Sequence, residues 1–433
     1  MPRTWRRLLN QPLAHNILAL YGVQFVNYVL PLITVPYLSR VLGPEEWGLL
    51  AFTQAFGAYL ALVVEYGFGL SATRQVAQVR DSISRRAELF ASVTGAKTVL
   101  AVLALGLALV VGRWIPSFQG HPLMLWAGVF WALATAFSPL WYFQGLERMR
   151  LVALLDVGAK TLSLFLIVLL VKAPWDGWKV LVIQGSASLF STLVAFSLVY
   201  QEVPVRFPRL HGIWEALRTG WSMFFFRGAV SLYTMGNTVI LGLFAPPQIV
   251  GYYAGAEKIT KAFLGLVGPL NQALYPRLSR LVKEAPAEAA RVTLIVMRVM
   301  GFLGVGLGAM VWVFAPFLVL VFLGSSYEPA IGVMRILSLL LPVISLNFAM
   351  HTQWMLPLGL DRPFNFIIVA SGLLNVTLGV LLVHYWLAEG MAWAVVFSEA
   401  FACLATWLYL RKVKLDPYSL RSGLVERRGE SQP

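Results

Sequence analysis

Residues 292–323 read VTLIVMRVMGFLGVGLGAMVWVFAPFLVLVFL, an apolar stretch whose only charged side chain is Arg298. A helix of about 20 apolar residues is long enough to cross a hydrocarbon layer roughly 30 Å thick. This stretch exceeds that length, and Pro316 lies two-thirds of the way along it, so we expect a tilted or kinked helix. The stretch predicts a membrane-spanning segment.

Composition extends this prediction to the whole chain. Of the 433 residues, 58% are hydrophobic and only 12% are charged, against roughly 25% charged residues in soluble globular domains. The formal net charge is +14, but the basic residues gather between apolar runs, which indicates membrane topology rather than nucleic-acid binding. The single cysteine, Cys403, excludes an intramolecular disulfide and a thiolate metal cluster, and the histidines show no metal-ligand spacing.

Apolar runs between charge clusters predict an all-α integral membrane protein with about twelve transmembrane helices. The first run is too long for the core of a signal peptide, so we expect it to be a retained helix. The expected spans are residues 14–38, 47–69, 88–112, 122–143, 151–171, 180–200, 219–244, 250–275, 292–323, 329–354, 363–385 and 389–410.

The orientation of the spans follows from the basic residues, because Lys and Arg in short loops are retained on the cytoplasmic side. With the amino terminus inside, most basic residues outside the spans fall in predicted inner segments. The predicted outer segments contain only Arg40, Arg113, Lys172 and Lys179. We therefore expect a multi-pass protein with both termini in the cytoplasm.

A short repeat divides the chain into two halves. Residues 44–51, PEEWGLLA, follow the first expected span, and residues 247–254, PQIVGYYA, follow the seventh. The longest hydrophilic connection, residues 201–218, lies between the sixth and seventh spans. We expect an amino-terminal six-helix bundle at 1–205 and a carboxy-terminal six-helix bundle with a cytoplasmic tail at 206–433. Because six is an even number, a parallel pseudo-two-fold repeat should relate the bundles.

Ionisable side chains within the expected spans are the main functional candidates, because each costs several kcal/mol in hydrocarbon unless it meets a partner or a polar cavity. Basic residues outnumber acidic ones in this set, which favours a negatively charged substrate and disfavours a cationic one. The basic residues are Lys97, Lys160, Arg227, Lys258, Lys261, Arg298 and Arg335, and the acidic residues are Glu65, Asp156, Glu257 and Glu399.

Some of these charges have a purely structural interpretation. Asp156 and Lys160 are spaced i,i+4, and so are Glu257 and Lys261, a spacing that places opposite charges on one helix face. Arg335 lies near the start of its span, from which a long side chain can reach the membrane interface. Within each pair, the two charges therefore either neutralise each other or take part in transport.

Four basic residues are stronger candidates, with contact to lipid phosphates as the alternative: Lys97, Arg227, Lys258 and Arg298. We expect these four, together with Lys160 and Lys261, to bind the anionic headgroup of a substrate. We expect a second set to carry a coupling proton or Na⁺, since burial favours the protonated form of a carboxyl group; the set is Glu65, Glu399, Asp156 and Glu257. For Glu65 and Glu399, an ion pair with a base on another helix is the alternative.

Five segments have a distinctive sequence: 23–48 (VQFVNYVLPLITVPYLSRVLGPEEWG), 65–77 (EYGFGLSATRQVA), 141–150 (WYFQGLERMR), 251–259 (GYYAGAEKI) and 273–281 (ALYPRLSRL). Together they resemble the lipid-linked oligosaccharide flippases of the Wzx type, which translocate O-antigen and exopolysaccharide units. These flippases form the polysaccharide transporter family, in the superfamily that also contains the MATE multidrug exporters. The resemblance covers nearly the whole chain.

The resemblance implies a MATE-like, V-shaped fold and a flippase in the bacterial cytoplasmic (inner) membrane. Its substrate would be an undecaprenyl-diphosphate-linked oligosaccharide, moved from the inner to the outer leaflet by alternating access for surface polysaccharide biosynthesis. The resemblance also implies coupling to H⁺ or Na⁺, with no other cofactor. A polysaccharide polymerase and assembly proteins are the partners that such a pathway would supply.

Two alternatives stay open at this point. A MATE-type multidrug or cation antiporter would need a net negative cavity, opposite to the basic excess found here. A membrane polysaccharide polymerase or ligase commonly uses a large outer loop or a carboxylate-rich domain, but no predicted outer loop exceeds about ten residues and no D-x-D cluster is present. The sequence favours a transporter over an enzyme.

Overall fold

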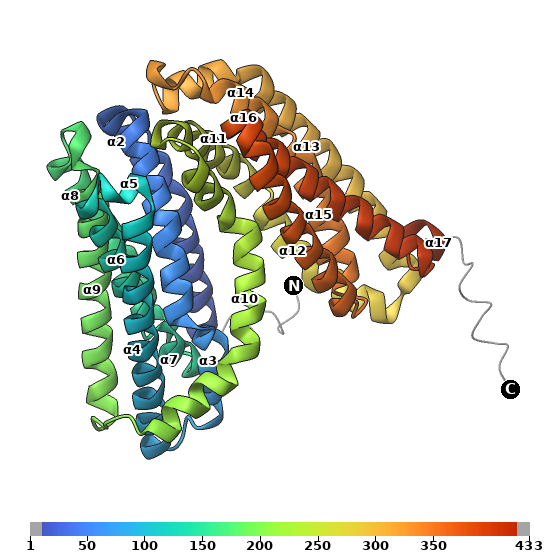
Figure 1. Ribbon diagram of the computed structural model, residues 1–433. Helices are drawn as coiled ribbons and strands as arrows, with labels where there is room; N and C mark the ends of the chain where they lie inside the picture. The colour runs from blue at the N-terminus through green and yellow to red at the C-terminus, as the bar shows by residue number, and fades with distance from the viewer. Residues whose placement is uncertain (1–10, 422–433) are drawn as a thin grey trace, which may run out of the picture. The chain divides into compact units, whose positions relative to one another are not determined.

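The computed structural model describes residues 11–421, and every regular element in that range is a helix (Figure 1). Residues 1–10, whose Arg3, Arg6 and Arg7 are predicted to be cytoplasmic, and the tail beyond residue 421 lie outside the described residues. The prediction of an all-α protein is confirmed for the described range.

Tertiary contacts divide the chain into two compact units, Met1–Ser231 and Leu232–Pro433, here called unit 1 and unit 2. Their boundary lies inside the long helix α10 (Leu210–Phe244). A division into two six-helix bundles at residues 205 and 206, with a pseudo-two-fold repeat, stays a prediction.

Unit 1 is built from helices that run along one another, with short elements at their ends (Figure 1). Its elements before α10 are α2 (Gln11–Glu65), α3 (Phe68–Gln78), α4 (Ile83–Trp114), α5 (Pro116–Gln119), α6 (Pro122–Ala136), α7 (Leu140–Gly145), α8 (Met149–Leu170), η1 (Pro174–Asp176) and α9 (Gly177–Glu202).

Unit 2 begins in the second part of α10, and its described regular elements are also all helices. The π-helical turn η3 continues directly from α15, and a short turn separates it from α16. The elements after α10 are α11 (Pro247–Gly265), α12 (Gly268–Glu284), α13 (Pro286–Phe322), η2 (Ser325–Tyr327), α14 (Ala330–Ser338), α15 (Leu340–Met350), η3 (His351–Met355), α16 (Asp361–Lys412) and α17 (Pro417–Arg421).

Two elements contain a sharp break in the backbone. Gly43 in α2 has a φ of 72° and Leu387 in α16 has a φ of 48°, so each element consists of two helices. Both values lie in the left-handed region, which an α-helix cannot contain. The first break falls between the expected spans 14–38 and 47–69, and the second between 363–385 and 389–410.

Seven segments of the described residues are long and apolar enough to cross a membrane. The helices α8, α10 and α11 coincide with three further expected spans. A helical, multi-pass membrane protein is supported, whereas the number twelve stays a prediction. The seven segments are Ile33–Gln78, Ile83–Trp114, Pro122–Gly145, Pro174–Glu202, Pro286–Phe322, Ala330–Met355 and Asp361–Leu420.

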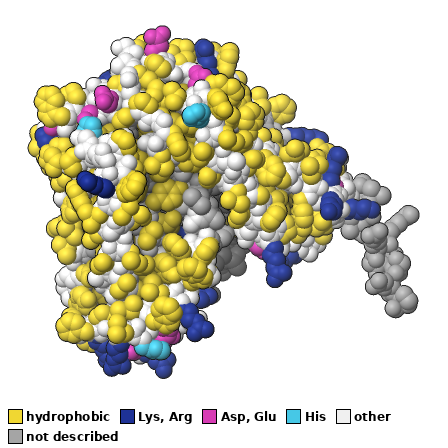
Figure 2. Space-filling view, viewed as in Figure 1, with side chains coloured by type: hydrophobic (Ala, Val, Ile, Leu, Met, Phe, Trp, Pro, Cys, Tyr) yellow, Lys and Arg dark blue, Asp and Glu magenta, His cyan; other side chains and the backbone are white. Residues whose placement is uncertain are grey.

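Within unit 1, α6 lies at the centre of the packing, against α2 on one side and α9 on the other. Large side chains such as Trp47, Phe52 and Phe90 are fully buried, and the ring of Phe52 stacks on Phe118 at 4.8 Å. Figure 2 shows apolar side chains covering most of the visible helix surfaces, with Lys and Arg gathered at the ends of the helices. This distribution fits an apolar solvent around the helices and water at their ends.

Within unit 2, α13 packs closely against α14 and α15 through small residues. A Cβ atom at Gly304 would lie 2.7 Å from Cα of Pro342 and 2.8 Å from the carbonyl oxygen of Leu341. Gly308, one turn further along α13, faces the carbonyl oxygen of Ser338. Small residues spaced in this way allow helix backbones to approach closely in membranes.

Replacing Gly304 by Leu should therefore destabilise unit 2, because the new side chain meets backbone atoms that cannot rotate away. Overpacking of this kind costs typically about 1–3 kcal/mol. The apparent melting temperature of the purified protein in detergent measures the effect. Gly306→Leu is the matched control on the same helix, since Gly306 has no neighbouring atom within 4 Å of the added Cβ; equal melting temperatures of the two variants would contradict the packing described here.

Candidate functional site

Glu65 and Arg227, two of the sequence-predicted candidates, form an ion pair in unit 1. Nη1 of Arg227 donates to Oε1 of Glu65 at 2.7 Å, although 162 positions separate the two residues in the chain. Their side chains are 38% and 36% exposed, so both retain access to the surroundings. An ion pair between Glu65 and a base on another helix was one of the two alternatives from the sequence, and Arg227 is that base. The structure thus brings a candidate headgroup-binding cation and a candidate proton carrier together.

The corner between α2 and α3 positions this pair. Tyr66 and Gly67 follow Glu65 with φ values of 48° and 76°, so the chain turns sharply just after the carboxylate. A Cβ at Gly67 would lie 2.8 Å from Cβ of Met223 on α10. Only glycine allows this approach, which holds the corner against the turn of α10 that precedes Arg227.

An aromatic cluster surrounds the corner. The ring of Tyr66 stacks on Phe224 with 4.7 Å between centroids, and Trp221 meets Phe225 edge to face at 4.6 Å. Trp221 and Phe225 are both more than half exposed. The ion pair therefore lies beside an aromatic surface that is open to ligands or lipid.

Lys97 occupies a different environment in unit 1. Its side chain is 2% exposed, and Nζ donates to the carbonyl oxygens of Ala136 at 2.7 Å and Ser138 at 3.3 Å. Ala136 is the last residue of α6, where carbonyl groups lack intrahelical partners and carry partial negative charge. Lys97 therefore supplies hydrogen bonds to carbonyl groups at the end of α6, and this contact links α4 to α6.

The two i,i+4 pairs form as the spacing predicts. Nζ of Lys160 lies 2.7 Å from Asp156 on α8, and Nζ of Lys261 lies 3.0 Å from Glu257 on α11. The side chains of the first pair are 43% and 45% exposed. Glu257 is more enclosed and also accepts a hydrogen bond from the hydroxyl of Tyr253 at 3.4 Å.

The remaining candidates lie on three helices of unit 2. Lys258 follows Glu257 on α11 and is half-buried, whereas Arg298 on α13 is exposed and has no ion pair among the described residues. Glu399 on α16 accepts a hydrogen bond from Nδ2 of Asn347 on α15 at 2.8 Å. The structure does not bring Arg298 and Glu399 together.

Buried amides are the residues that sequence reasoning missed. Asn375 on α16 is fully buried, and neither polar atom of its side chain has a hydrogen-bond partner. Asn237 and Asn347 are also buried in unit 2, and the side-chain oxygen of each is unpartnered. Asparagine inside an apolar run was the available signal, but a search for formal charges passes over neutral polar groups.

The site contains binding groups rather than a catalytic constellation. Among the described residues, no group of three or more His, Cys, Asp and Glu side chains could hold a metal ion. His351 in η3 is buried and lies 2.7 Å from the hydroxyl of Thr406. Ion pairs, exposed cations and aromatic rings can bind and release an anionic ligand, which is the chemistry of transport.

Relatives of the chain are consistent with this chemistry. Two proteins named "Putative O-antigen transporter" are similar over nearly their whole length. The one from Escherichia coli (strain K12) is 31% identical over 93% of this chain and 97% of its own. The one from Shigella dysenteriae is 30% identical over 90% of this chain and 98% of its own.

Solved structures of low sequence identity share the fold. The lipid II flippase MurJ in an inward closed conformation matches with a TM-score of 0.68 and 11% identity, over 97% of this chain and 94% of that chain. An inward-facing multidrug resistance MATE family transporter of the MOP superfamily matches with a TM-score of 0.64 and 16% identity, over 92% of this chain and 96% of that chain. The chain therefore has the MATE-like fold.

The family model described as polysaccharide biosynthesis protein matches residues 13–282, more than half of the chain. The resemblance inferred from the sequence is thereby confirmed, and the curated relatives agree with it. The chain is a membrane transporter, not an enzyme, and it belongs to the polysaccharide biosynthesis protein family.

Proposed function

We propose that the protein is a flippase that moves an undecaprenyl-diphosphate-linked oligosaccharide from the inner to the outer leaflet of the bacterial cytoplasmic membrane. The observation that carries the proposal is the similarity to two proteins named as O-antigen transporters, which extends over 97% and 98% of their lengths. A lipid-linked oligosaccharide is the substrate that these names imply for surface polysaccharide biosynthesis. The excess of basic residues in the helices supports the same substrate class.

The physical problem for such a substrate is its diphosphate. An isolated ionised group pays an idealised cost of tens of kcal/mol on entering hydrocarbon, so a polar route with basic side chains is required. The polyprenyl tail can stay in the bilayer while the headgroup crosses. The proposed headgroup-binding residues are Arg227, Arg298 and Lys258, with Lys160 and Lys261. Lys97, expected from the sequence to join them, is 2% exposed and bonded to the end of α6, so it supports the fold instead.

The proposed mechanism is alternating access, in which two bundles rock around a basic central cavity. An inside-negative membrane potential favours outward movement of negative charge by about 2.3 kcal/mol per charge per 100 mV. Glu65, Glu257, Glu399 and Asp156 are the proposed carriers of a coupling proton or Na⁺. A polymerase and assembly proteins of the polysaccharide pathway are proposed partners.

A MATE-type antiporter of cationic drugs is the second candidate, and the shared fold supports it. The distribution of charges favours this function less, because a cationic drug would bind to acidic side chains. Each of the four acidic candidates already has a hydrogen-bonding or ion-pair partner, namely Arg227, Lys160, Lys261 or Asn347. The basic candidates remain in excess, and an excess of positive charge repels a cationic substrate.

Arg298→Gln should slow translocation at least about tenfold, because a neutral side chain loses a charge-assisted contact worth roughly 1.5–3 kcal/mol. Transport of a radiolabelled undecaprenyl-diphosphate oligosaccharide into the outer leaflet of proteoliposomes measures the rate. Arg362→Gln, at an exposed position at the start of α16, is the control. Equal rates for both variants would remove Arg298 from the site, and no transport by the intact protein, across several glycans and with proton and Na⁺ gradients, would contradict the flippase proposal.

Substitutions of Glu65 and Arg227 test whether their ion pair acts in the fold, in transport or in both. Glu65→Gln and Arg227→Gln should each lower stability by up to about 1 kcal/mol, since the pair is partly exposed. The double exchange Glu65→Arg with Arg227→Glu should recover the melting temperature but not transport, because the cation has moved to α2. Recovery of both quantities would show that the pair acts only in the fold.

Thiol labelling tests the proposed orientation with both termini in the cytoplasm. In a Cys403→Ala background, Glu45→Cys should react with a membrane-impermeant maleimide in spheroplasts. Asp81→Cys should react only after permeabilisation, because its loop is predicted to be cytoplasmic; both positions are exposed. The reverse pattern would invert the orientation.

A further inference from the structure

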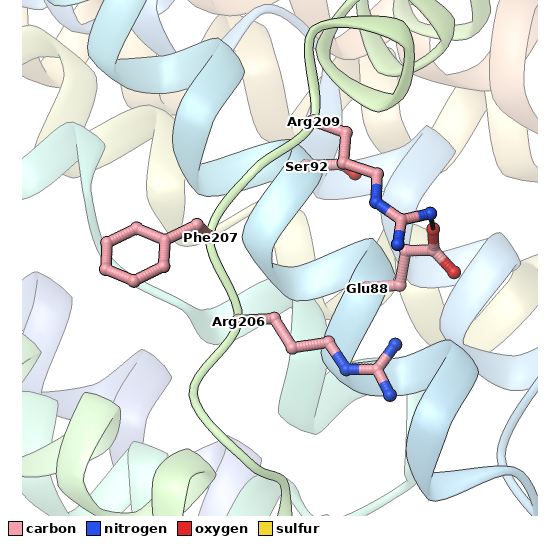
Figure 3. Close-up of a pocket in the computed structure, with 5 residues that line it drawn as sticks. All are labelled: Glu88, Ser92, Arg206, Phe207 and Arg209. Atoms are coloured by element: carbon pink, nitrogen blue, oxygen red, sulfur yellow. Dashed lines mark ion pairs between the residues drawn. The ribbon is translucent and has the colours of Figure 1, made fainter.

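A basic pocket lies in unit 1 where the connection between α9 and α10 passes over α4 (Figure 3). Its volume is about 350 Å³, and its lining residues are Glu88, Ser92, Arg206, Phe207 and Arg209. None of them belongs to the proposed transport site. By the positive-inside distribution, the connection is predicted to lie at the cytoplasmic face of the membrane.

Close packing fixes the connection on α4. A Cβ at Gly95 would lie 2.7 Å from Cβ of Pro208, so the absence of a side chain on α4 lets the connection approach. At the other end of the pocket, Nη2 of Arg206 donates to the hydroxyl of Ser84 at 3.0 Å. The pocket is therefore held by contacts on both sides.

The charges in the pocket favour an anion. Arg206 and Arg209 extend toward the same side of the connection, and Glu88 on α4 faces Arg209 (Figure 3). The Nη1 of Arg209 lies 3.8 Å from Oε1 of Glu88, with side chains 83% and 54% exposed. Such an exposed and long ion pair contributes little, so a stronger acceptor can replace the carboxylate. A phosphate group is that acceptor, because guanidinium binds it with two parallel hydrogen bonds.

Apolar side chains on the same connection indicate where the phosphate comes from. Phe207 is 92% exposed and points away from the two guanidinium groups in Figure 3. Leu210 and Trp214, at the start of α10, are also strongly exposed. Apolar side chains beside basic ones are typical of a segment that lies in the membrane interface, with the apolar groups among acyl chains and the cations among headgroups.

We propose that this pocket binds the phosphate headgroup of an anionic membrane lipid, with Arg206 and Arg209 as its ligands and Phe207 as the adjacent acyl-chain contact. Two lipids carry this chemistry, a bulk phospholipid such as phosphatidylglycerol and the polyprenyl phosphate carrier. Glu88 limits the affinity, because its carboxylate competes with the phosphate for Arg209. Net charge alone would also produce these two effects, so a charge removed outside the pocket is the control that distinguishes this site from general electrostatic attraction to the membrane surface.

The test titrates the purified full-length protein in detergent separately with phosphatidylglycerol, undecaprenyl phosphate and zwitterionic phosphatidylcholine. Microscale thermophoresis measures the binding. The double variant Arg206→Gln with Arg209→Gln should bind the anionic lipids at least about tenfold more weakly, as loss of a charge-assisted hydrogen bond predicts. Glu88→Gln should bind them more tightly. Arg80→Gln, an exposed position in the loop before α4, is the control for net charge and should leave binding unchanged. Melting temperatures verify that each variant is folded.

Tight binding of phosphatidylglycerol assigns the site to bulk lipid, and binding of undecaprenyl phosphate alone assigns it to the carrier. Both results support the proposal. Unchanged affinity in the double Arg variant, an equal loss in Arg80→Gln, or equal binding of phosphatidylcholine would overturn it. The assay contains no transport step, so its outcome is independent of the proposed flippase activity.

Discussion

Hydrocarbon contains no water to hydrogen-bond the backbone, and every exposed N–H or C=O group there costs several kcal/mol. Helices satisfy this constraint because each backbone group finds its partner within the same segment. Where helices end inside the fold, other groups must complete the hydrogen bonds. The ammonium of Lys97 does so at the end of α6, where it meets the carbonyl groups of Ala136 and Ser138. A charge that is costly in lipid thereby becomes part of the architecture.

The cost of a charge in hydrocarbon likewise explains why the acidic side chains have partners. Glu65, Asp156, Glu257 and Glu399 each contact a base or an amide, namely Arg227, Lys160, Lys261 and Asn347. The acidic groups are therefore partly neutralised, while the basic groups stay in excess. A transporter with this balance is suited to an anionic headgroup, and the neutral amides of Asn237 and Asn375 add polar groups without adding negative charge.

Close backbone approach is the second requirement of the fold. Gly304 permits contact between α13 and the start of α15, Gly67 permits contact between the α2–α3 corner and α10, and Gly95 permits contact between α4 and the α9–α10 connection. In each case the close approach sets the position of a nearby element. Gly67 and Gly95 thus help to position Arg227 and the basic pocket.

The sequence by itself determined the helical membrane class, the approximate position of the helices and the excess of basic charge. It also determined the pairs Asp156–Lys160 and Glu257–Lys261, because residues four apart on a helix share a face whatever surrounds the helix. The tertiary structure alone decided that Glu65 meets Arg227, that Lys97 meets the end of α6 and that Asn347 meets Glu399. These contacts join different helices, whose relative positions depend on side-chain packing over the whole unit and not on any local repeat.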